Sequence, residues 1–164
     1  MLKCNCPKCQ NLFQGFNNAE PIETANPPRE KGVYVIRIKK AGNSDRLSET
    51  LSSLKLFFEK TEWERLRTWV GRRVARLNNY KESDCDIIYI GCGGKQQKKQ
   101  GSIFDRHDGF VTGHTVMYPL WILLYHGWKI DLGWRVDYNA SQLENNLRHS
   151  YYDLHGRYPI LDGN

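Results

Sequence analysis

Two short glycine–tyrosine motifs contain the residues best suited to proton-transfer chemistry. The first is Gly32-Val-Tyr34 and the second is Tyr89-Ile-Gly91. Each lies in a run of β-branched and aromatic residues that predicts a β-strand. A tyrosine hydroxyl takes part in proton transfer as a base only when it is ionised, and its reference pKa near 10 lies about 3 units above neutrality. This is a handicap of roughly 4 kcal/mol that neighbouring cations must offset.

Charged side chains suited to phosphate chemistry follow the second motif. Lys95 comes after a glycine-rich turn, and a predicted helix then carries Arg106 and His107. The guanidinium of Arg106 can donate two hydrogen bonds to one phosphate; alternatively, it forms an ion pair with a neighbouring aspartate. Glu144 offers a hard oxygen ligand for Mg²⁺, although Ser141-x-x-Glu144 is also the pattern of a helix capping box.

A strongly basic segment separates the two motifs. Apolar residues recur every three or four positions from 47 to 77, which predicts two amphipathic helices or one bent helix. This face either binds nucleic acid or is solvated and paired with nearby glutamates. The chain has 24 Lys and Arg against 18 Asp and Glu, a net charge of +6, which favours a polyanionic partner. The candidate DNA-binding residues are Arg65, Arg72, Arg73, Arg76, Lys98 and Lys99, with Arg67 beside them.

Three of the five cysteines crowd together near the start of the sequence, at Cys4, Cys6 and Cys9. An odd number of cysteines with this spacing is a poor disulfide framework, so reduced thiols are expected. Cys6-Pro-Lys-Cys9 resembles half of a zinc knuckle. Cys4 is a candidate third ligand for Zn²⁺, and Cys85, Cys92 or a histidine brought in by folding is a candidate fourth. The alternative is a frayed terminus with ordinary thiols.

The length and the turn signals predict one domain with an insert. Residues 1–31 are expected to form a cysteine-containing extension and linker, because they are turn-rich and include a Pro27-Pro28 pair. Residues 32–164 are expected to form the domain, with a helical insert at about 42–84 between the first two core strands.

The second half of the chain predicts further elements around these strands. Ser102-Ile-Phe-Asp105 has the pattern of a helix start. The apolar run 116–126 and the alternating run 128–136 are expected to form a β-hairpin, and a helix is expected from Ser141 to about Leu154. The expected fold class is therefore α+β, of α/β-sandwich-like form, with a small central mixed or antiparallel sheet flanked by helices.

No run of 18 consecutive apolar residues occurs, and the first residues lack the apolar run of a secretory signal. We therefore expect a soluble, cytoplasmic protein without a membrane partner.

The order of these motifs and residues resembles the GIY-YIG endonuclease family, most of all its restriction-endonuclease members. The resemblance covers about residues 32–38 and 86–164. The family's two motifs usually lie close together on one hairpin, whereas here the helical segment intervenes, as long inserts do in certain restriction enzymes of the family.

The resemblance implies a role for each candidate. The tyrosine of the first motif activates the attacking water, the arginine clamps the phosphate, and the glutamate holds Mg²⁺ or Mn²⁺. The implied catalytic residues are Tyr34, Tyr89, Arg106, Glu144, His107 and Lys95, and the implied structural residues of the site are Gly32, Gly91 and Asn164.

The implied function is metal-dependent hydrolysis of double-stranded DNA at specific sites, in the manner of a type II restriction enzyme of prokaryotic or phage-like source acting as a homodimer. Two alternatives remain: a nucleic-acid-binding module without activity on the same fold, and a structure-selective repair or phage nuclease.

Overall fold

The computed structural model describes residues 6–9, 11–60, 64, 66–77, 80–81, 85–93, 102–105, 107 and 116–162, with only the backbone described at 57–59, 66, 67 and 69. Its elements follow in the order η1 (Pro7–Cys9), β1 (Glu20–Pro21), β2 (Gly32–Lys40), α1 (Ser44–Lys60), η2 (Leu66–Gly71), α2 (Arg72–Leu77), β3 (Ile87–Gly93), α4 (Met117–Tyr125), β4 (Lys129–Val136) and α5 (Ala140–His155).

The four strands form one antiparallel sheet in the order β1-β4-β2-β3. The predicted α+β class, with helices around a small sheet and a helical insert between two core strands, is confirmed. β2 lies in the interior of the sheet, and its run of apolar residues is buried on both faces. The first motif begins β2, and the second lies in β3, the strand paired beside it.

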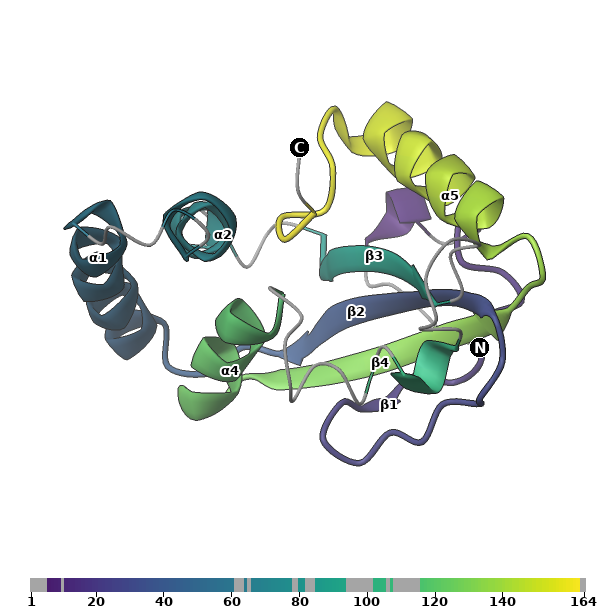
Figure 1. The fold of residues 1–164 in the computed structure, drawn as a ribbon, viewed down its shortest axis with the longest axis horizontal. Helices are drawn as coiled ribbons and strands as arrows, with labels where there is room; N and C mark the ends of the chain where they lie inside the picture. The colour runs from purple at the N-terminus through teal and green to yellow at the C-terminus, as the bar shows by residue number, and fades with distance from the viewer. Residues whose placement is uncertain are drawn as a thin grey trace.

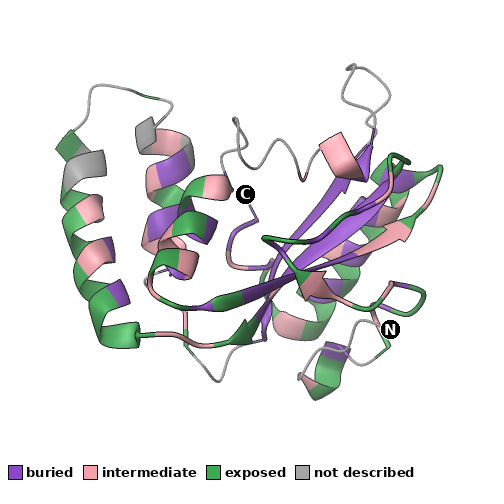
Figure 2. Cartoon of the chain, turned by 90° about the horizontal axis from the view of Figure 1, so that it is seen from below, coloured by how far each residue is buried: buried purple, intermediate pink, exposed green. Residues whose placement is uncertain are grey.

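Helices cover the two faces of the sheet differently. α5 packs on β2 and β3, while α1, α2 and α4 stand together near the other end of the strands (Figure 1). Buried residues of these three helices share a core with the face of β2 that points away from α5. Alternate residues of β2 point to the two sides: Val33 and Val35 belong to the core under α5, and Tyr34 and Ile36 belong to the core under the insert. The strands are buried between layers whose outer helical surfaces are exposed (Figure 2).

The segment before β2 differs from the extension and linker expected there. Its residues Phe13 and Phe16 are buried in the core under α5, and Ile22 is buried in the core under the insert. β1 pairs with β4, which makes this segment one edge of the sheet. The described residues of the range 6–31 are therefore part of the domain.

The expected hairpin at 116–136 is wrong in its first half. Residues Met117–Tyr125 form the helix α4, and only the second half, β4, is a strand. An unbroken apolar run fits a buried helix as well as a buried strand. Pro119 is tolerated because it lies in the first turn of α4, where a backbone N–H has no partner within the helix.

Other local predictions are confirmed. Ser102 and Asp105 form a reciprocal cap, in which the Asp105 backbone N–H donates to Ser102 Oγ at 3.0 Å and the Ser102 N–H donates to the Asp105 carboxylate at 3.0 Å. α5 covers the predicted range and ends at Gly156, whose φ of 69° is the left-handed conformation that glycine adopts most readily. Among the described residues, no helix is both long enough and apolar enough to cross a bilayer.

Candidate functional site

Tyr34 and Tyr89 lie side by side on β2 and β3. Their ring centroids are 5.9 Å apart, and their hydroxyl groups are hydrogen-bonded to each other. The antiparallel register places Tyr34 opposite Gly91. A Cβ atom at Gly91 would lie 2.6 Å from Tyr34 Oη and 2.7 Å from Tyr89 Cε1, so the two rings occupy the space that any other side chain would need. The two sequence motifs therefore meet at one point in the sheet.

Gly32 has a similar packing reason to be glycine. It pairs with Gly93 on β3, and a Cβ atom there would lie 2.2 Å from the carbonyl oxygen of Arg135 on β4. Because Gly32 has no side chain, β2 can pair with both β3 and β4 at this position. Both glycines therefore serve the strand arrangement that brings the tyrosines together.

Arg73 comes from α2 in the insert and reaches the tyrosine pair from the side. It is only 7% exposed, and its Nε donates to the carbonyl oxygen of Leu161 at 2.9 Å. Burial lowers the pKa of Arg73, while the charges of Tyr89 and Asp162 act to raise it. A buried cation is thus held next to two phenols and a carboxylate.

This position corrects the prediction that Arg73 belongs to an exposed DNA-binding face. Arg72, its neighbour, is exposed, and Arg76 is half-buried with its guanidinium donating to the backbone carbonyl oxygen of Asp162. Consecutive residues of an α-helix point about 100° apart, so Arg72 faces solvent while Arg73, the next residue of α2, faces the core.

Asp162 is a site residue that sequence reasoning missed. The N–H of its neighbour Leu161 donates to the Ile88 carbonyl at 2.8 Å, which lays this segment along the free edge of β3. The Asp162 carboxylate is buried, accepts a hydrogen bond from the Ile90 N–H, and lies 3.4 Å from Arg148 Nε. A single aspartate after a helix carries no recognisable signal, because only the path of the chain brings it to β3.

The environment of Asp162 keeps a large fraction of its carboxyl group protonated at neutral pH. Burial, as the largest cause, raises its pKa to about 7, and the Glu144 carboxylate adds to this rise. Arg148, the Ile90 N–H and Arg73 act in the opposite direction. Two carboxylates therefore lie close enough to repel each other in a buried place.

Glu144 is buried on α5 and accepts a hydrogen bond from Cys92 Sγ of β3, with a sulfur–oxygen distance of 2.8 Å. It does not act as the cap of α5, because the helix begins after Asn139 and Ser141 lies inside it. The capping-box alternative for Ser141 and Glu144 is therefore not what the structure shows.

Because Cys92 belongs to the core under α5, Glu144 lies on the α5 side of β3, whereas Tyr34 and Tyr89 lie on the insert side. Its charge nevertheless acts on both Tyr89 and Asp162. The residues around this end of β3, which are Tyr34, Tyr89, Arg73, Glu144 and Asp162, are called the tyrosine–carboxylate cluster below.

Burial also sets the chemistry of Tyr89. It raises the pKa of the Tyr89 phenol far above its ordinary value, and the charges of Asp162 and Glu144 add to this rise. Arg73 and the hydrogen bond from Tyr34 lower it again. Tyr89 is therefore a phenol that stays protonated.

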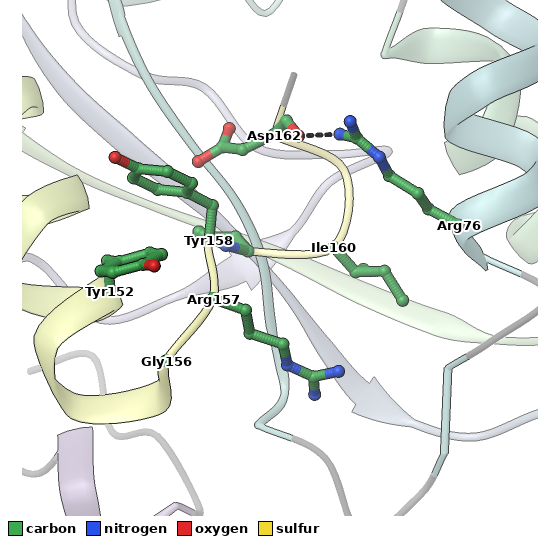
Figure 3. Close-up of a pocket in the computed structure, with 8 residues that line it drawn as sticks. Arg76, Tyr152, Gly156, Arg157, Tyr158, Ile160 and Asp162 are labelled. Carbon is green, nitrogen blue, oxygen red and sulfur yellow. Dashed lines mark hydrogen bonds between the residues drawn. The ribbon is translucent and has the colours of Figure 1, made fainter. Parts of the chain in front are cut away.

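An open pocket of about 410 Å³ lies beside this cluster, with Asp162 in its wall. Figure 3 shows Arg76, Arg157 and the rings of Tyr152 and Tyr158 around it. The two tyrosine rings are 5.0 Å apart. The pocket thus offers two cations and two aromatic faces next to the buried carboxyl group of Asp162.

His107 was predicted to be catalytic, but its ring is bound elsewhere. Its Nε2 lies 2.7 Å from the carbonyl oxygen of Ile22, directly after the edge strand β1. It lines an apolar cavity of about 490 Å³ formed with α4. The tyrosine–carboxylate cluster lies at β3, the opposite edge of the sheet. The predicted site residues that lie outside the described part of the chain are Cys4, Arg65, Lys95, Lys98, Lys99, Arg106 and Asn164.

A second cluster, called the cysteine–histidine cluster below, consists of Cys6, Cys9, Cys85 and His155. One ligand atom from each residue lies within 4.8 Å of every other, so these four residues could hold a metal ion. Cys9 Sγ lies 3.7 Å from Cys85 Sγ and 3.0 Å from His155 Nε2. The sequence pointed to Cys6 and Cys9 and named Cys85, Cys92 or a histidine as candidates for the fourth ligand; folding brings both Cys85 and His155 to the first two cysteines.

Comparison of the chain with models of protein families, with curated proteins and with solved structures gave no match.

Proposed function

We propose that the protein is an intracellular, metal-dependent DNA endonuclease of the GIY-YIG type. The observation that carries the proposal is the pairing of β2 with β3, which sets Tyr34 opposite Gly91 and beside Tyr89. Two motifs separated by a long helical insert are thereby joined at one point of the sheet. The charges of Arg73 and Asp162 act on Tyr89 there, and the charge of Glu144 reaches it from the α5 side of β3. Hydrolysis of a phosphodiester needs such a set: a base, a cation for the phosphoryl oxygens and acidic metal ligands.

Tyr34 is the proposed base, because the resemblance gives this role to the tyrosine of the first motif. Tyr89 stays protonated because burial raises its pKa, so its role is to form a hydrogen bond with Tyr34 and to orient it. Arg73 supports this arrangement, since its positive charge favours an ionised phenol beside it. Its buried guanidinium also supplies a fixed positive charge at the site where negative charge develops on the phosphate.

Glu144 and Asp162 fit Mg²⁺ or Mn²⁺. Both offer carboxylate oxygens, and Oδ2 of Asp162 is buried with no hydrogen bond from any described residue, apart from its ion pair with Arg148. A bound cation would relieve the charge repulsion by which Glu144 raises the pKa of Asp162. When bound, the metal ion stabilises charge on the phosphoryl and leaving oxygens.

The surroundings of the cluster suit double-stranded DNA. The net charge is +6, and Arg76 and Arg157 line the pocket next to Asp162. Arg72 adds an exposed cation from the insert. These residues provide contacts to the phosphate backbone, and the insert provides the element that reads sequence in a site-specific, homodimeric enzyme.

One observation favours a second candidate, a nucleic-acid-binding module without activity. Tyr34 is 1% exposed and Tyr89 is 9% exposed, so neither phenol meets solvent directly. In this alternative the tyrosines and Arg73 are core residues, and only the arginines of the surface contact nucleic acid.

For the cysteine–histidine cluster the proposed metal is Zn²⁺. Thiolate sulfur and imidazole nitrogen are ligands that zinc prefers and magnesium avoids. The two proposed metals are thus assigned to different places by their donor atoms.

Cleavage of supercoiled plasmid tests the nuclease proposal. The assay compares the wild type with and without Mg²⁺ or Mn²⁺, and then Glu144→Gln with Asp153→Asn, which changes an exposed acid on the same helix. Metal-dependent cutting that is lost in folded Glu144→Gln and kept in Asp153→Asn supports the proposal. Cutting retained by folded Glu144→Gln contradicts the metal role of Glu144. DNA binding without any cutting by the wild type supports the binding module instead.

A further inference from the structure

We infer that the cysteine–histidine cluster is a closed, four-ligand structural zinc site that joins the start of the described chain, the entry to β3 and the end of α5. The inference is independent of nuclease activity. It rests on the geometry of four ligand atoms from three segments that are distant in sequence.

The donor set is the first argument. Three thiols and one imidazole form a Cys₃His site, a set that structural zinc sites use. Cys6 and Cys9 have the two-residue spacing of a zinc knuckle, and the Cys9 N–H donates to the Cys6 carbonyl at 3.0 Å, which forms the tight turn between them. The four cysteines that the structure describes, including Cys85, are not in disulfides.

The distances are the second argument. With Zn–S bonds of about 2.3 Å and Zn–N bonds of about 2.0–2.1 Å, a tetrahedral site places two sulfurs about 3.8 Å apart and a sulfur and a nitrogen about 3.6 Å apart. The observed separations are 3.7 Å between Cys9 Sγ and Cys85 Sγ, and 3.0 Å between Cys9 Sγ and His155 Nε2. All the ligand atoms lie within 4.8 Å of one another, so small side-chain rotations suffice to bind the ion. The sulfur separation is far too long for a disulfide, whose S–S bond is about 2.05 Å.

Burial is the third argument, and it points to a structural role. Cys9 and Cys85 are buried, and Cys6 and His155 are partly buried. Four protein ligands fill a tetrahedral coordination sphere, so no position is left for a substrate or a reactive water. The ring of Tyr151 stacks on His155 with centroids 4.2 Å apart, which holds the imidazole in place.

The topology shows what the ion would stabilise. η1 has only three residues and cannot fold by itself, whereas Cys85 lies two residues before β3 and His155 is the last residue of α5. A shared ion ties these three pieces together across 76 residues between Cys9 and Cys85 and 146 residues between Cys9 and His155. Cys92 is excluded from the site, because its thiol donates to Glu144.

Metal analysis of the full chain, expressed without an affinity tag and refolded with Zn²⁺, tests the inference. We expect about one tightly held zinc ion per chain after dialysis, and loss of thermal stability when a chelator removes it. Cys9→Ser and His155→Gln are expected to lose the ion. Their matched controls are Cys92→Ser, a buried cysteine outside the cluster, and His149→Gln, an exposed histidine on the same helix; both are expected to keep it.

Two results would overturn the inference: a wild type that holds no zinc after refolding in its presence, and ligand variants that hold as much zinc as their controls. Should the ligand variants fail to fold, the Co²⁺ form of the wild type decides. Intense visible bands of tetrahedral Co²⁺ with thiolate charge-transfer absorption support the site, and the weak spectrum of octahedral Co²⁺ contradicts it.

Discussion

The buried carboxyl of Asp162 makes the stability of the protein depend on pH in a direction that is unusual for an aspartate. Its pKa is raised from 3.8 to about 7 in the folded state, mainly by burial. In the unfolded chain the same group gives up its proton near pH 4. Between these two values the folded state binds more protons than the unfolded state, so the free energy of unfolding falls as pH rises. The contribution is fully present below about pH 4 and is lost as pH passes through 7.

The size of this effect follows from the shift. A difference of about 3 pKa units, at 1.36 kcal/mol for each unit, corresponds to about 4 kcal/mol. Asp162 is only 3% exposed, so solvent screening does not reduce the figure much. Asp162→Asn replaces the carboxyl by a neutral group of nearly the same shape, whose oxygen can still accept the hydrogen bond from the Ile90 N–H. It should therefore remove this pH dependence.

The pH dependence of the free energy of unfolding can be measured by urea denaturation followed by tryptophan fluorescence. The measurement is made at several pH values from about 4.5 to 8, without added Mg²⁺. Relative to the wild type, Asp162→Asn is expected to become more stable with rising pH by about 2–4 kcal/mol over this range. Asp153→Asn, at an exposed position, should follow the wild type. An identical pH slope in the wild type and Asp162→Asn would refute the reasoning, because it would show that the folded state does not hold the proton.

Two further substitutions test the packing of the tyrosine–carboxylate cluster. Gly91→Ala is expected to lower the free energy of unfolding by about 1–3 kcal/mol, because the new Cβ would lie 2.6 Å from Tyr34 Oη; unchanged thermal denaturation would contradict this contact. Arg73→Met is expected to cost about 1–3 kcal/mol, since the Leu161 carbonyl loses its charged donor, whereas exposed Arg72→Met should stay within about 0.5 kcal/mol. Equal losses of stability in these two variants, measured by urea denaturation, would contradict the buried position of Arg73.

Several parts of the candidate site could be predicted from local sequence. Tyr34 and Tyr89 lie in strands because β-branched and aromatic neighbours favour extended backbone, and both strands are confirmed. Glu144 lies on the predicted helix α5. Cys6 and Cys9 show their two-residue spacing directly in the sequence. In each case the residue and the signal that identifies it lie within a few positions of each other.

The errors have equally specific causes. Arg73 was assigned to the basic face because it lies among closely spaced arginines, but α2 turns it about 100° away from Arg72 and into the core. Residues Met117–Tyr125 are apolar on every side, so no periodicity distinguishes a helix from a strand there. Pro27 and Pro28 indicate a turn-rich segment. They carry no information on whether Phe13 and Ile22, which precede them in the chain, are buried.

The sequence by itself determined the elements, because strand propensity, helix caps and apolar periodicity act between neighbouring residues. It was sufficient for the α+β class, for both tyrosine strands and for the two cysteines Cys6 and Cys9 of the candidate zinc site, with Cys85 and a histidine only among its candidates for a further ligand. Only the tertiary structure decided which distant groups meet: Arg73 and Asp162 with the tyrosines, and Cys85 and His155 with the first cysteines. These encounters depend on the path of the chain along the edge of β3 and on the packing of α5, which arise from burial summed over the whole domain rather than from any local pattern.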